Sequence, residues 1–394
     1  MTFIEIIFFV GLVVIFYSYA GYGILLWVLV KIKFLVKKNK TYPNNNNYPR
    51  VTLLVAAYNE EQFILQKIEN TLSLDYPSEN LDIVFITDGS TDRTSEIVKL
   101  YPQITLLHQP ARNGKIAAMH RAMGMVNTPY VIFSDANTIL NKASIKNIIR
   151  HYQDPKVGGV AGEKKVIQST NNNNAGGEGL YWKYESFLKK LDWKFYTVVG
   201  AAGELFSIRT SLYEYPGDDI LLDDFIISLS ICKKGYRIAY EAEAYASESE
   251  SASIQEEQKR KIRISAGGFQ SIYILRDLLN IFKYPVLSFQ YISHRILRWT
   301  LCPIFLPVIF FFNILLVVNN ESGFFYLVML AQTFFYVGAF IGWILSKKGI
   351  KISLFYAPYY LVFINYSLYL GFIRFIKGNQ TVLWEKAARS QIGA

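Results

Sequence analysis

The sequence predicts an α/β protein with a doubly wound, mostly parallel sheet, flanked by helices that cross a membrane. Two observations predict this class. From residue 51 onward, apolar strand-like runs alternate with segments of helical periodicity, which is the pattern of consecutive βαβ units. Near both ends of the chain, apolar stretches reach roughly the 20 residues that a helix needs to span a bilayer.

The alternation defines the expected elements of the sheet. Strands are expected at 51–57, 82–87, 104–108, 130–134 and 157–166. Helices are expected between them, at 60–72, 92–100 and 114–126. Because ligands of open α/β sheets bind at the carboxyl ends of the strands, we expect the chemistry in the loops that follow residues 57, 87 and 134.

The composition narrows the classes of function. Hydrophobic residues make up 52% of the 394 residues, and the formal net charge is +10. The basic residues cluster beside the apolar segments, which suits a membrane surface, and no nucleic-acid-binding signature is present. Only Cys232 and Cys302 occur, so a disulfide framework and a cysteine zinc site are excluded. We therefore expect a membrane-associated protein that does not bind nucleic acid.

The amino-terminal apolar stretch predicts the orientation of the chain. Residues 3–30 contain one charged residue, Glu5, and five lysines follow within residues 31–40. Positive charge accumulates on the cytoplasmic side of a span, so the part that follows is expected in the cytoplasm, at the inner membrane of the cell. Further spans are expected at 300–318, 323–345 and 353–373.

These further spans leave one conflict. Three crossings would place the basic tail at 377–394 outside, against the preference of positive charge for the cytoplasm. Either the segment 353–373, which contains Pro358, is not a simple span, or the tail lies outside. The sequence leaves both alternatives open.

Two acidic stretches are candidate chemical centres. The strand at 130–134 ends in Asp135, and Asn137 follows, so two oxygen ligands stand ready for a divalent cation. The alternative is an Asx turn that caps the next helix. Asp223 and Asp224 begin a second helix, where acidic residues are also common partners of the helix dipole. Both stretches therefore have a structural and a chemical interpretation.

Four motifs in series resemble one enzyme family. AAYNEE, ITDGSTDRT, NGK and FSDANT follow one another in the order and spacing of family 2 glycosyltransferases, which share the GT-A fold and include cellulose, chitin and hyaluronan synthases. The resemblance implies a nucleotide-sugar donor, expected to be uridine-linked, and a divalent metal, Mg²⁺ or Mn²⁺, on the diphosphate. It implies that Asp135 and Asn137 meet this metal. The implied donor-binding residues are Ala57, Tyr58, Glu60, Asp88, Lys115, Asp135 and Arg260.

The same resemblance assigns the catalytic residues. Asp224 matches the general base, with Asp223 as its neighbour, and Arg263 is expected on the diphosphate. The sequence departs from the family pattern at four places. Thr87 stands where many relatives have a first aspartate, and Asn137 replaces the second carboxylate of Asp-x-Asp. Arg260 and Ile264 replace the Gln and Trp of Gln-x-x-Arg-Trp. The missing Trp puts stacking of the acceptor and long-chain processivity in doubt.

The expected organisation follows from these parts. We expect a membrane anchor at 1–33, a linker at 34–50, the glycosyltransferase domain at 51–250, amphipathic interface helices at 251–299, a membrane region at 300–376 and a basic tail at 377–394. Arg295, Arg298 and Trp299 are expected to anchor the interface region on lipid headgroups.

The function expected from these residues is inverting transfer of a sugar to a growing polysaccharide or a lipid-linked saccharide at the membrane. The rival hypothesis is a catalytically silent nucleotide-sugar sensor or scaffold, in which Asn137 has spoiled the metal site. A transporter is disfavoured because most of the chain is soluble.

Overall fold

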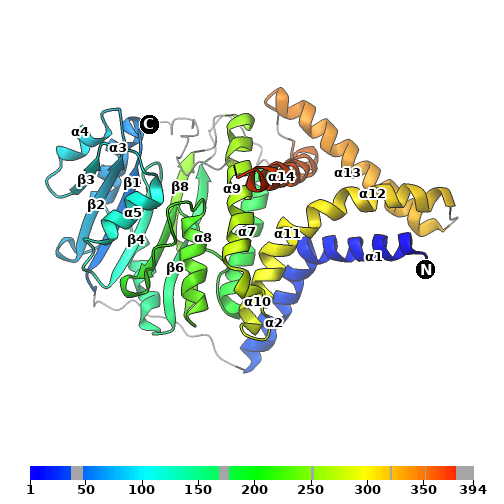
Figure 1. The fold of residues 1–394 in the computed structure, drawn as a ribbon, viewed down its shortest axis with the longest axis horizontal. Coiled ribbons are helices and arrows are strands. Elements are labelled where there is room, and N and C mark those ends of the chain that lie inside the picture. Colours follow the sequence, from blue (N-terminus) through cyan, green and yellow to red (C-terminus); the bar gives the residue numbers. More distant parts are fainter. Residues whose placement is uncertain (37–47, 168–176, 250–252, 320–321, 351, 379–394) are drawn as a thin grey trace.

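The structure, a computed structural model, describes residues 1–36, 48–167, 177–249, 253–319, 322–350 and 352–378. Most of the linker expected at 34–50, and the tail from residue 379 on, lie outside the described residues. Figure 1 shows one sheet with its helices, joined to a group of long helices that extends away from it.

The first half of the sheet is parallel, as the alternating pattern predicts. Its strands are β1 (Val51–Ala57), β2 (Leu81–Asp88), β3 (Thr105–Gln109) and β4 (Tyr130–Asp135), in the order β3-β2-β1-β4. β1 is buried along its whole length because it lies between β2 and β4. In this register Ala56 pairs with Asp135 and Ala57 pairs with Thr87, so the predicted loops meet at one edge.

The second half of the sheet departs from the parallel pattern at two strands. β7 (Leu205–Arg209) lies antiparallel between β4 and β6 (Val157–Ile167). β8 (Arg237–Ser249) returns parallel to β6, and the short β5 (Ile139–Leu140), which pairs antiparallel with β8, completes the eight strands that the structure describes. The predicted mostly parallel α/β sheet is therefore confirmed, with β7 as an insertion.

Helices cover both faces of the sheet and divide the core into two clusters. On one face, Leu54 and Ile86 pack with α5 (Lys115–Met123) and α8 (Asp223–Lys233). On the other face, Leu53 and Phe85 pack with α3 (Glu61–Leu72), α4 (Thr94–Lys99) and α6 (Ser144–Ile149). Adjacent strand residues point to opposite faces, which is why Leu53 and Leu54 fall in different clusters.

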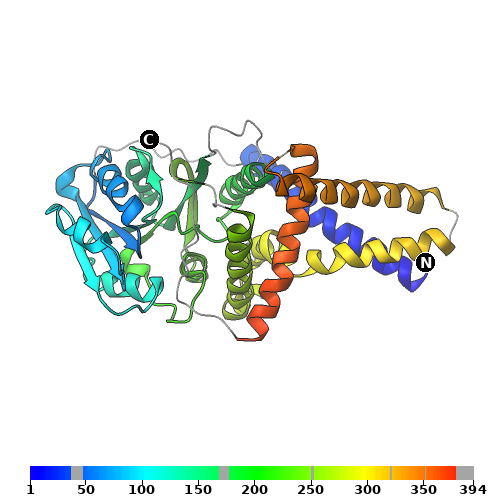
Figure 2. The same cartoon turned by 90° about the horizontal axis from the view of Figure 1, so that it is seen from above.

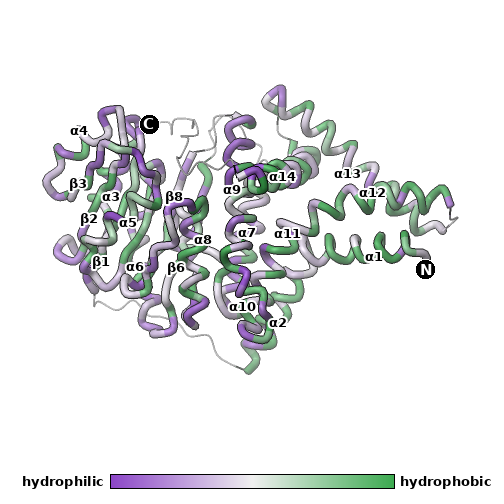
Figure 3. The backbone as a smooth tube through the Cα atoms, in the orientation of Figure 1, coloured by the Kyte–Doolittle hydropathy of each residue, from purple (hydrophilic) through white to green (hydrophobic). Residues whose placement is uncertain are grey.

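Three apolar helices form the group that extends from the sheet. α1 (Phe3–Phe16) and α12 (Leu301–Asn319) run side by side in both Figures 1 and 2, and α13 (Gly323–Lys347) returns from the far end of α12 at an angle to it. Figure 3 shows that they are hydrophobic over most of their length. By length and composition, four helical segments of the described chain are apolar enough to cross a membrane: Phe3–Val36, which begins with α1, together with α12, α13 and α14 (Ser353–Ile376). These four segments are candidate membrane spans.

α14 is oriented differently from the other apolar helices. Figure 2 shows it lying crosswise to α12 and α13, between the bundle and the sheet, and Figure 1 shows it nearly end-on. It packs closely on α9 (Ile254–Ile274): a Cβ atom added to Gly371 would lie 2.9 Å from the backbone nitrogen of Ala266. The arrangement favours the first alternative above, that 353–373 is not a simple span.

The amino-terminal apolar stretch bends instead of forming one straight span. The π-helical turn η1 (Tyr17–Gly21) separates α1 from α2 (Tyr22–Val36), and α2 turns away from the bundle to pack on α7 (Gly177–Phe195). A π-turn is a common cause of a sharp change in helix direction. Only α1 continues alongside α12, so the anchor expected at 1–33 has a part in the bundle and a part that packs on the α/β domain.

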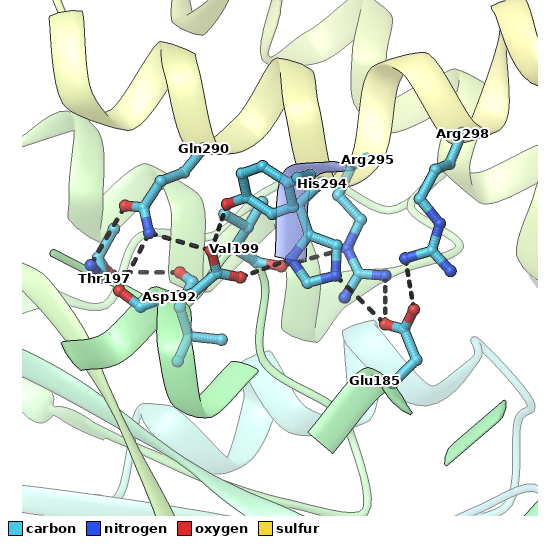
Figure 4. Close-up of polar contacts among 10 residues, drawn as sticks. Glu185, Asp192, Thr197, Val199, Gln290, His294, Arg295 and Arg298 are labelled. Carbon is cyan, nitrogen blue, oxygen red and sulfur yellow. Dashed lines mark hydrogen bonds and ion pairs between the residues drawn. The ribbon is translucent and has the colours of Figure 1, made fainter. Parts of the chain in front are cut away.

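A buried polar cluster joins α2, α7 and the segment that precedes the bundle. That segment comprises α10 (Pro285–Tyr291), the π-turn η6 (Ile292–Ile296) and α11 (Leu297–Trp299). His294 lies between two carboxylates, with Nδ1 2.5 Å from Asp192 and Nε2 3.4 Å from Glu185 (Figure 4). The hydroxyl of Tyr22 on α2 also donates to Asp192. These contacts connect α2, the second part of the amino-terminal helical segment, to α7 of the α/β domain.

The expected lipid contacts of Arg295 and Arg298 are wrong. Arg298 is 7% exposed and lies 2.6 Å from Glu185, while Arg295 lies 3.0 Å from the same carboxylate. Arg295 Nε also donates to the carbonyl of Val199 (Figure 4). A sequence pattern does not distinguish an arginine at a headgroup from one paired inside the protein. Here the partner carboxylate lies more than a hundred residues earlier in the chain.

Replacing Glu185 with Gln is expected to destabilise the protein by about 3–5 kcal/mol, because the buried His294, Arg295 and Arg298 would lose their shared counter-charge. The check is thermal unfolding of the purified protein in detergent. Asp277→Asn is the control: it breaks an exposed pair with Lys233, worth at most about 1 kcal/mol. Equal melting temperatures for the two variants would contradict a structural role for Glu185.

Candidate active site

Asp135 lies where β4 ends, at the carboxyl edge of the sheet. Its Oδ1 accepts a hydrogen bond of 2.6 Å from Nζ of Lys115, at the start of α5. The next described helix does not begin until Ser144, so Asp135 and Asn137 do not cap it. The structure thus disfavours the helix-capping interpretation of this stretch. The carboxylate of Asp135 pairs instead with the ammonium group of Lys115.

A buried lysine that sequence reasoning missed holds the turn that follows β4 through hydrogen bonds. Lys67 on α3 is fully buried, and its Nζ donates to Ser134 Oγ at 2.7 Å and to the carbonyl of Thr138 at 2.9 Å. Burial lowers the pKa of Lys67 to about 7, although Asp135 acts against the shift. The available signal was a lysine spaced three and four residues from Ile64 and Thr71, on the buried face of the predicted helix.

Asp88, the predicted contact of the donor base, shapes the loop that leads into α5. Its Oδ2 accepts hydrogen bonds from the backbone N–H groups of Asn113 and Gly114, at 2.8 and 2.7 Å. Gly114 has φ 97°, a conformation that favours glycine. Asp88 thereby helps fix the position of Lys115. Its Oδ1 has no hydrogen-bond partner among the described residues and lies 3.8 Å from Nη1 of Arg121.

Four of the predicted donor residues line one small cavity of about 10 Å³: Ala57, Tyr58, Asp88 and Lys115. Arg112, which sequence reasoning missed, also lines it. The guanidinium of Arg112 lies 3.8 Å from the centre of the Tyr58 ring. A flat aromatic base could be held between such groups only if Arg112 moves away from the ring. Stacking between aromatic and guanidinium planes is common in proteins that bind bases.

Glu60 lies at the start of α3, behind this cavity. It is buried, and its backbone N–H donates to Thr94 Oγ1 at 2.8 Å. The preceding Asn59 adopts φ 53°, and its side-chain oxygen accepts from the backbone N–H of Thr91 at 2.8 Å. These bonds join the loops after β1 and β2, which explains how the motifs AAYNEE and ITDGSTDRT come together.

Asp223 and Asp224 begin α8, as predicted. Asp224 Oδ1 accepts from the N–H of Phe225 at 2.8 Å, so part of this carboxylate does serve the helix terminus. A Cβ atom added to Gly203 would lie 3.5 Å from Asp224 Oδ2 and 3.4 Å from Lys115 Nζ. Gly203 therefore lies against both groups, and the structure brings α5, α8 and the loop before β7 to one place.

The loop before β7 is held by a second charged group. Glu204 lies 2.5 Å from Nζ of Lys164 on β6, and the same ammonium contacts Glu248 on β8. Arg209, on β7, donates to the carbonyls of Val157, Tyr152 and Asp154. Glu204 is a structural partner of Lys164 whose negative charge still reaches the site.

The pKa values of the site follow from burial and from this cluster of charges. Burial, with the repulsion of Asp223 and Glu204, raises the pKa of Asp224 to about 7, although Lys115 opposes the shift. Burial favours a lower pKa for Lys115, but the attraction of Asp135, Asp223 and Asp224 outweighs it and raises that pKa. The site therefore pairs a permanently charged ammonium with a carboxylate that titrates near neutrality, as a general base requires.

The catalytic rate should therefore depend on pH with an ascending limb. Asp224 accepts a proton only when ionised, so kcat/KM is expected to rise as pH increases through about 7 and then level off. Initial rates of nucleotide release between pH 5 and 9, at roughly constant ionic strength, measure this limb. A profile that is flat across this range, with the protein folded throughout, would contradict the assignment.

The remaining predicted residues lie on α9 and in the turn after β4. Arg260 pairs with Glu257 through two hydrogen bonds of 2.9 Å, and its charge also helps lower the pKa of Glu204. Arg263 follows it on the same helix.

No group of three His, Cys, Asp or Glu side chains in the described part of the chain is arranged to hold a metal. A metal here would need ligands from outside the protein, such as a diphosphate.

The sequence comparisons decide the family. Residues 52–215 match the profile described as Glycosyl transferase family 2, and this range contains the loops of β1, β2 and β4 and the start of α5. The chain carries a family 2 glycosyltransferase domain. The family and enzyme class expected from the four motifs are thereby confirmed for this domain.

Two curated relatives and one solved structure are similar to this chain over longer stretches. Poly-beta-1,6-N-acetyl-D-glucosamine synthase of Staphylococcus aureus is 25% identical over 275 residues, which is 65% of this chain and 65% of that protein. The probable glycosyltransferase YdaM of Bacillus subtilis is 25% identical over 256 residues, 61% of this chain and 60% of that protein. Each match thus spans less than two thirds of the relative.

The solved structure confirms the fold. Mannosyltransferase PcManGT from Pyrobaculum calidifontis, in complex with GDP-Man and Mn²⁺, has a TM-score of 0.71 and 20% identity, and the match covers 96% of this chain and 100% of that one. The predicted GT-A domain flanked by membrane-spanning helices is therefore confirmed as the architecture.

Proposed function

We propose that this glycosyltransferase is a membrane-bound inverting enzyme that transfers a sugar from a nucleoside diphosphate to a saccharide acceptor. The observation that carries the proposal is Asp224, a carboxylate with a pKa raised to about 7 beside Lys115 and the glycine-containing loop at Gly203. A buried carboxylate poised near neutral pH at the edge of a GT-A sheet is suited to remove a proton.

In the proposed reaction, Asp224 accepts the proton of an acceptor hydroxyl. The hydroxyl oxygen forms a bond to the anomeric carbon while the bond from that carbon to the diphosphate oxygen breaks. The nucleoside diphosphate leaves with the bonding electrons, and attack from the opposite face inverts the anomeric configuration. Asp223, whose Oδ2 has no partner among the described residues, is placed to accept a hydrogen bond from a sugar.

The residues present fit a divalent metal that is bound together with the diphosphate. Asp135 and Asn137 would hold it: Lys115 occupies Oδ1 of Asp135, and the second carboxylate oxygen and the Asn137 amide remain. Mg²⁺ commonly binds through one or two protein oxygens plus substrate phosphates, which agrees with the absence of a larger cluster among the described residues. When bound, such a metal would neutralise the leaving diphosphate.

The donor is proposed to bind in the cavity of Tyr58, Asp88 and Lys115, with its base displacing Arg112 from the Tyr58 ring. Lys115 would face the diphosphate, and Arg260 and Arg263 on α9 would close the site from the membrane side. Uridine is the proposed base. Because the staphylococcal relative is named a poly-N-acetylglucosamine synthase, UDP-N-acetylglucosamine is the first donor to test.

A silent nucleotide-sugar sensor is the competing function, and the electrostatics argue against it. A domain that only bound donor would need neither a carboxylate with a pKa near 7 nor the buried, unpartnered Asp223 Oδ2 at the acceptor side. Burying such groups costs stability, so their retention favours chemistry.

The deciding experiment measures nucleotide release from a donor panel by the purified, membrane-reconstituted protein with Mn²⁺. The panel holds UDP-N-acetylglucosamine, UDP-glucose and GDP-mannose, each with a saccharide or a lipid-linked acceptor, followed by linkage analysis. We expect acceptor-dependent release from one UDP-sugar. Saturable donor binding without release under every condition would support the sensor instead.

The catalytic domain is proposed to face the cytoplasm, because five lysines follow the first apolar stretch and none precede it. Single cysteines at the exposed positions Thr2 and Lys99, in a background where the buried Cys232 and Cys302 are kept, test this. In intact cells a membrane-impermeant thiol reagent should label position 2 and should label position 99 only after permeabilisation. The reverse pattern would overturn the proposed orientation.

A further inference from the structure

A large cavity lies at the edge of the sheet opposite Asp135. It measures about 1090 Å³ and lies between the end of α2, the end of α7, the 3₁₀ turn η3 (Arg150–Gln153) and the start of β8. Val157 and Arg237, the first residues of β6 and β8, pair with each other here. Since β4 ends at the opposite edge, this cavity is separate from the proposed donor site.

The lining of this cavity carries an excess of positive charge. It contains six lysines and arginines against three carboxylates. The carboxylates are already used: Glu241 and Glu243 pair with Arg150, and Asp154 pairs with Arg237. In the part of the chain that the structure describes, no carboxylate lies within ion-pair distance of Lys156, Lys190 or Lys194. The charged groups of the cavity lining that have no ion-pair partner among the described residues are therefore positive.

The inner part of the cavity offers hydrogen-bond donors that nothing uses. Tyr240 is 6% exposed and lines the cavity, yet its hydroxyl has no hydrogen-bond partner among the described residues. The Nε of Arg237 also lacks a partner there. A buried hydroxyl without a partner costs about 1–3 kcal/mol, so a ligand that accepts hydrogen bonds is the simplest reason to keep it.

A lysine neutralises the negative end of the α7 dipole beside the cavity. The carboxyl end of a helix normally repels negative charge. Here the Nζ of Lys33 donates to the carbonyls of Lys194 and Phe195, at 2.9 and 2.7 Å. Lys33 therefore occupies the acceptors and adds a positive charge at the wall of the cavity.

The remaining wall is formed by the end of α2, which exposes apolar side chains. α2 buries Tyr22, Leu26 and Val30 against α7, while its opposite side exposes apolar residues. At its end Leu35 is 87% exposed and Val36, which lines the cavity, is 80% exposed. Figure 1 shows α2 running along the boundary between the sheet and the bundle. An apolar helix face in this position suits the headgroup region of a bilayer.

From these observations we propose that the cavity between α2, α7 and β8 binds the phosphate headgroup of an anionic phospholipid. The phosphate would lie between Lys190, Lys194 and Lys156 and accept hydrogen bonds from Tyr240 and Arg237. The acyl chains would follow the exposed apolar side of α2. The inference does not depend on the proposed function, since it uses no residue of the donor site.

The test uses the full chain, purified and stripped of lipid in detergent, with binding followed by native mass spectrometry. The probes are phosphatidylglycerol and phosphatidylcholine with identical acyl chains. Lys190→Ala with Lys194→Ala should weaken phosphatidylglycerol binding about thirtyfold, at about 1 kcal/mol per lysine. Tyr240→Phe, which removes only the hydroxyl, should weaken it about tenfold.

The matched control removes two exposed lysines elsewhere, Lys99→Ala with Lys183→Ala, and should bind like the unaltered protein. Melting temperatures of all variants show whether each is folded. Equal affinity for the two lipids, or equal weakening by the control, would overturn the proposal. Displacement of the lipid by glycerol phosphate at the same concentration would also overturn it, because the site would then be one for a soluble phosphate.

Discussion

Asp224→Asn is expected to reduce the rate of sugar transfer by about 10²–10⁴-fold while leaving donor affinity nearly unchanged. The amide has the shape of the carboxylate but cannot take the proton of the acceptor hydroxyl. Asp224 begins α8, and its Oδ1 already accepts a hydrogen bond from the N–H of Phe225, a contact that an amide oxygen can keep. The fold should therefore survive the substitution.

The measurement pairs initial rates of nucleotide release with a calorimetric titration of the donor. Asp219→Asn is the matched control: it makes the same change five residues earlier, at an exposed carboxylate in the loop before α8. The control should retain full activity. If Asp224→Asn turned over at a near-normal rate, Asp224 would be only the first-turn partner of the helix dipole, which is the alternative that the sequence left open.

The sheet could be predicted because each strand and helix has a local signal. β1, β2 and β4 are continuous apolar runs, and α3 and α5 carry apolar residues at helical spacing. β7 escaped prediction as an antiparallel strand because direction is not encoded in a five-residue apolar run. It depends on the connection from β6 through α7, which brings the chain back beside β4.

The site was predictable where a motif names a residue and missed where the residue acts from another element. Asp135, Lys115 and Asp224 were found from their motifs, and the structure brings Lys115 close to both carboxylates. Lys67 and Arg112 were missed because each reaches the site across a tertiary contact, to Ser134 and to Tyr58. Neither neighbour is close in sequence.

The direction of α14 also could not be predicted from the sequence, because it depends on tertiary packing. Hydropathy identifies α14 as long and apolar enough to cross, yet the helix packs on α9 and lies crosswise to α12 and α13. Its contact with Ser265 and Ala266 depends on Gly371, which lets the two backbones approach. Composition measures how well a helix tolerates lipid, whereas its direction depends on such packing.

Asp135→Ala is expected to remove the dependence of donor binding on metal. Asn137 alone offers one neutral oxygen, which is too weak a ligand to retain a divalent cation against water. The gain in affinity for uridine diphosphate on adding Mn²⁺ should fall by at least about 10–100-fold, which is the usual cost of losing even an outer partner of a metal site. Calorimetric titrations with and without Mn²⁺ measure this gain directly.

The comparison must be made between the two titrations and not on affinity alone. Removing Asp135 also frees Lys115 from its 2.6 Å hydrogen bond, and an ammonium released in this way can itself bind a diphosphate. Metal-independent affinity for the diphosphate is thus expected to be kept or increased in the variant. Asp82→Ala, which breaks an exposed pair with Arg50, is the control and should keep the full effect of Mn²⁺. A variant at position 135 that also kept this effect would show that Asp135 serves only to hold Lys115 at the edge of the sheet.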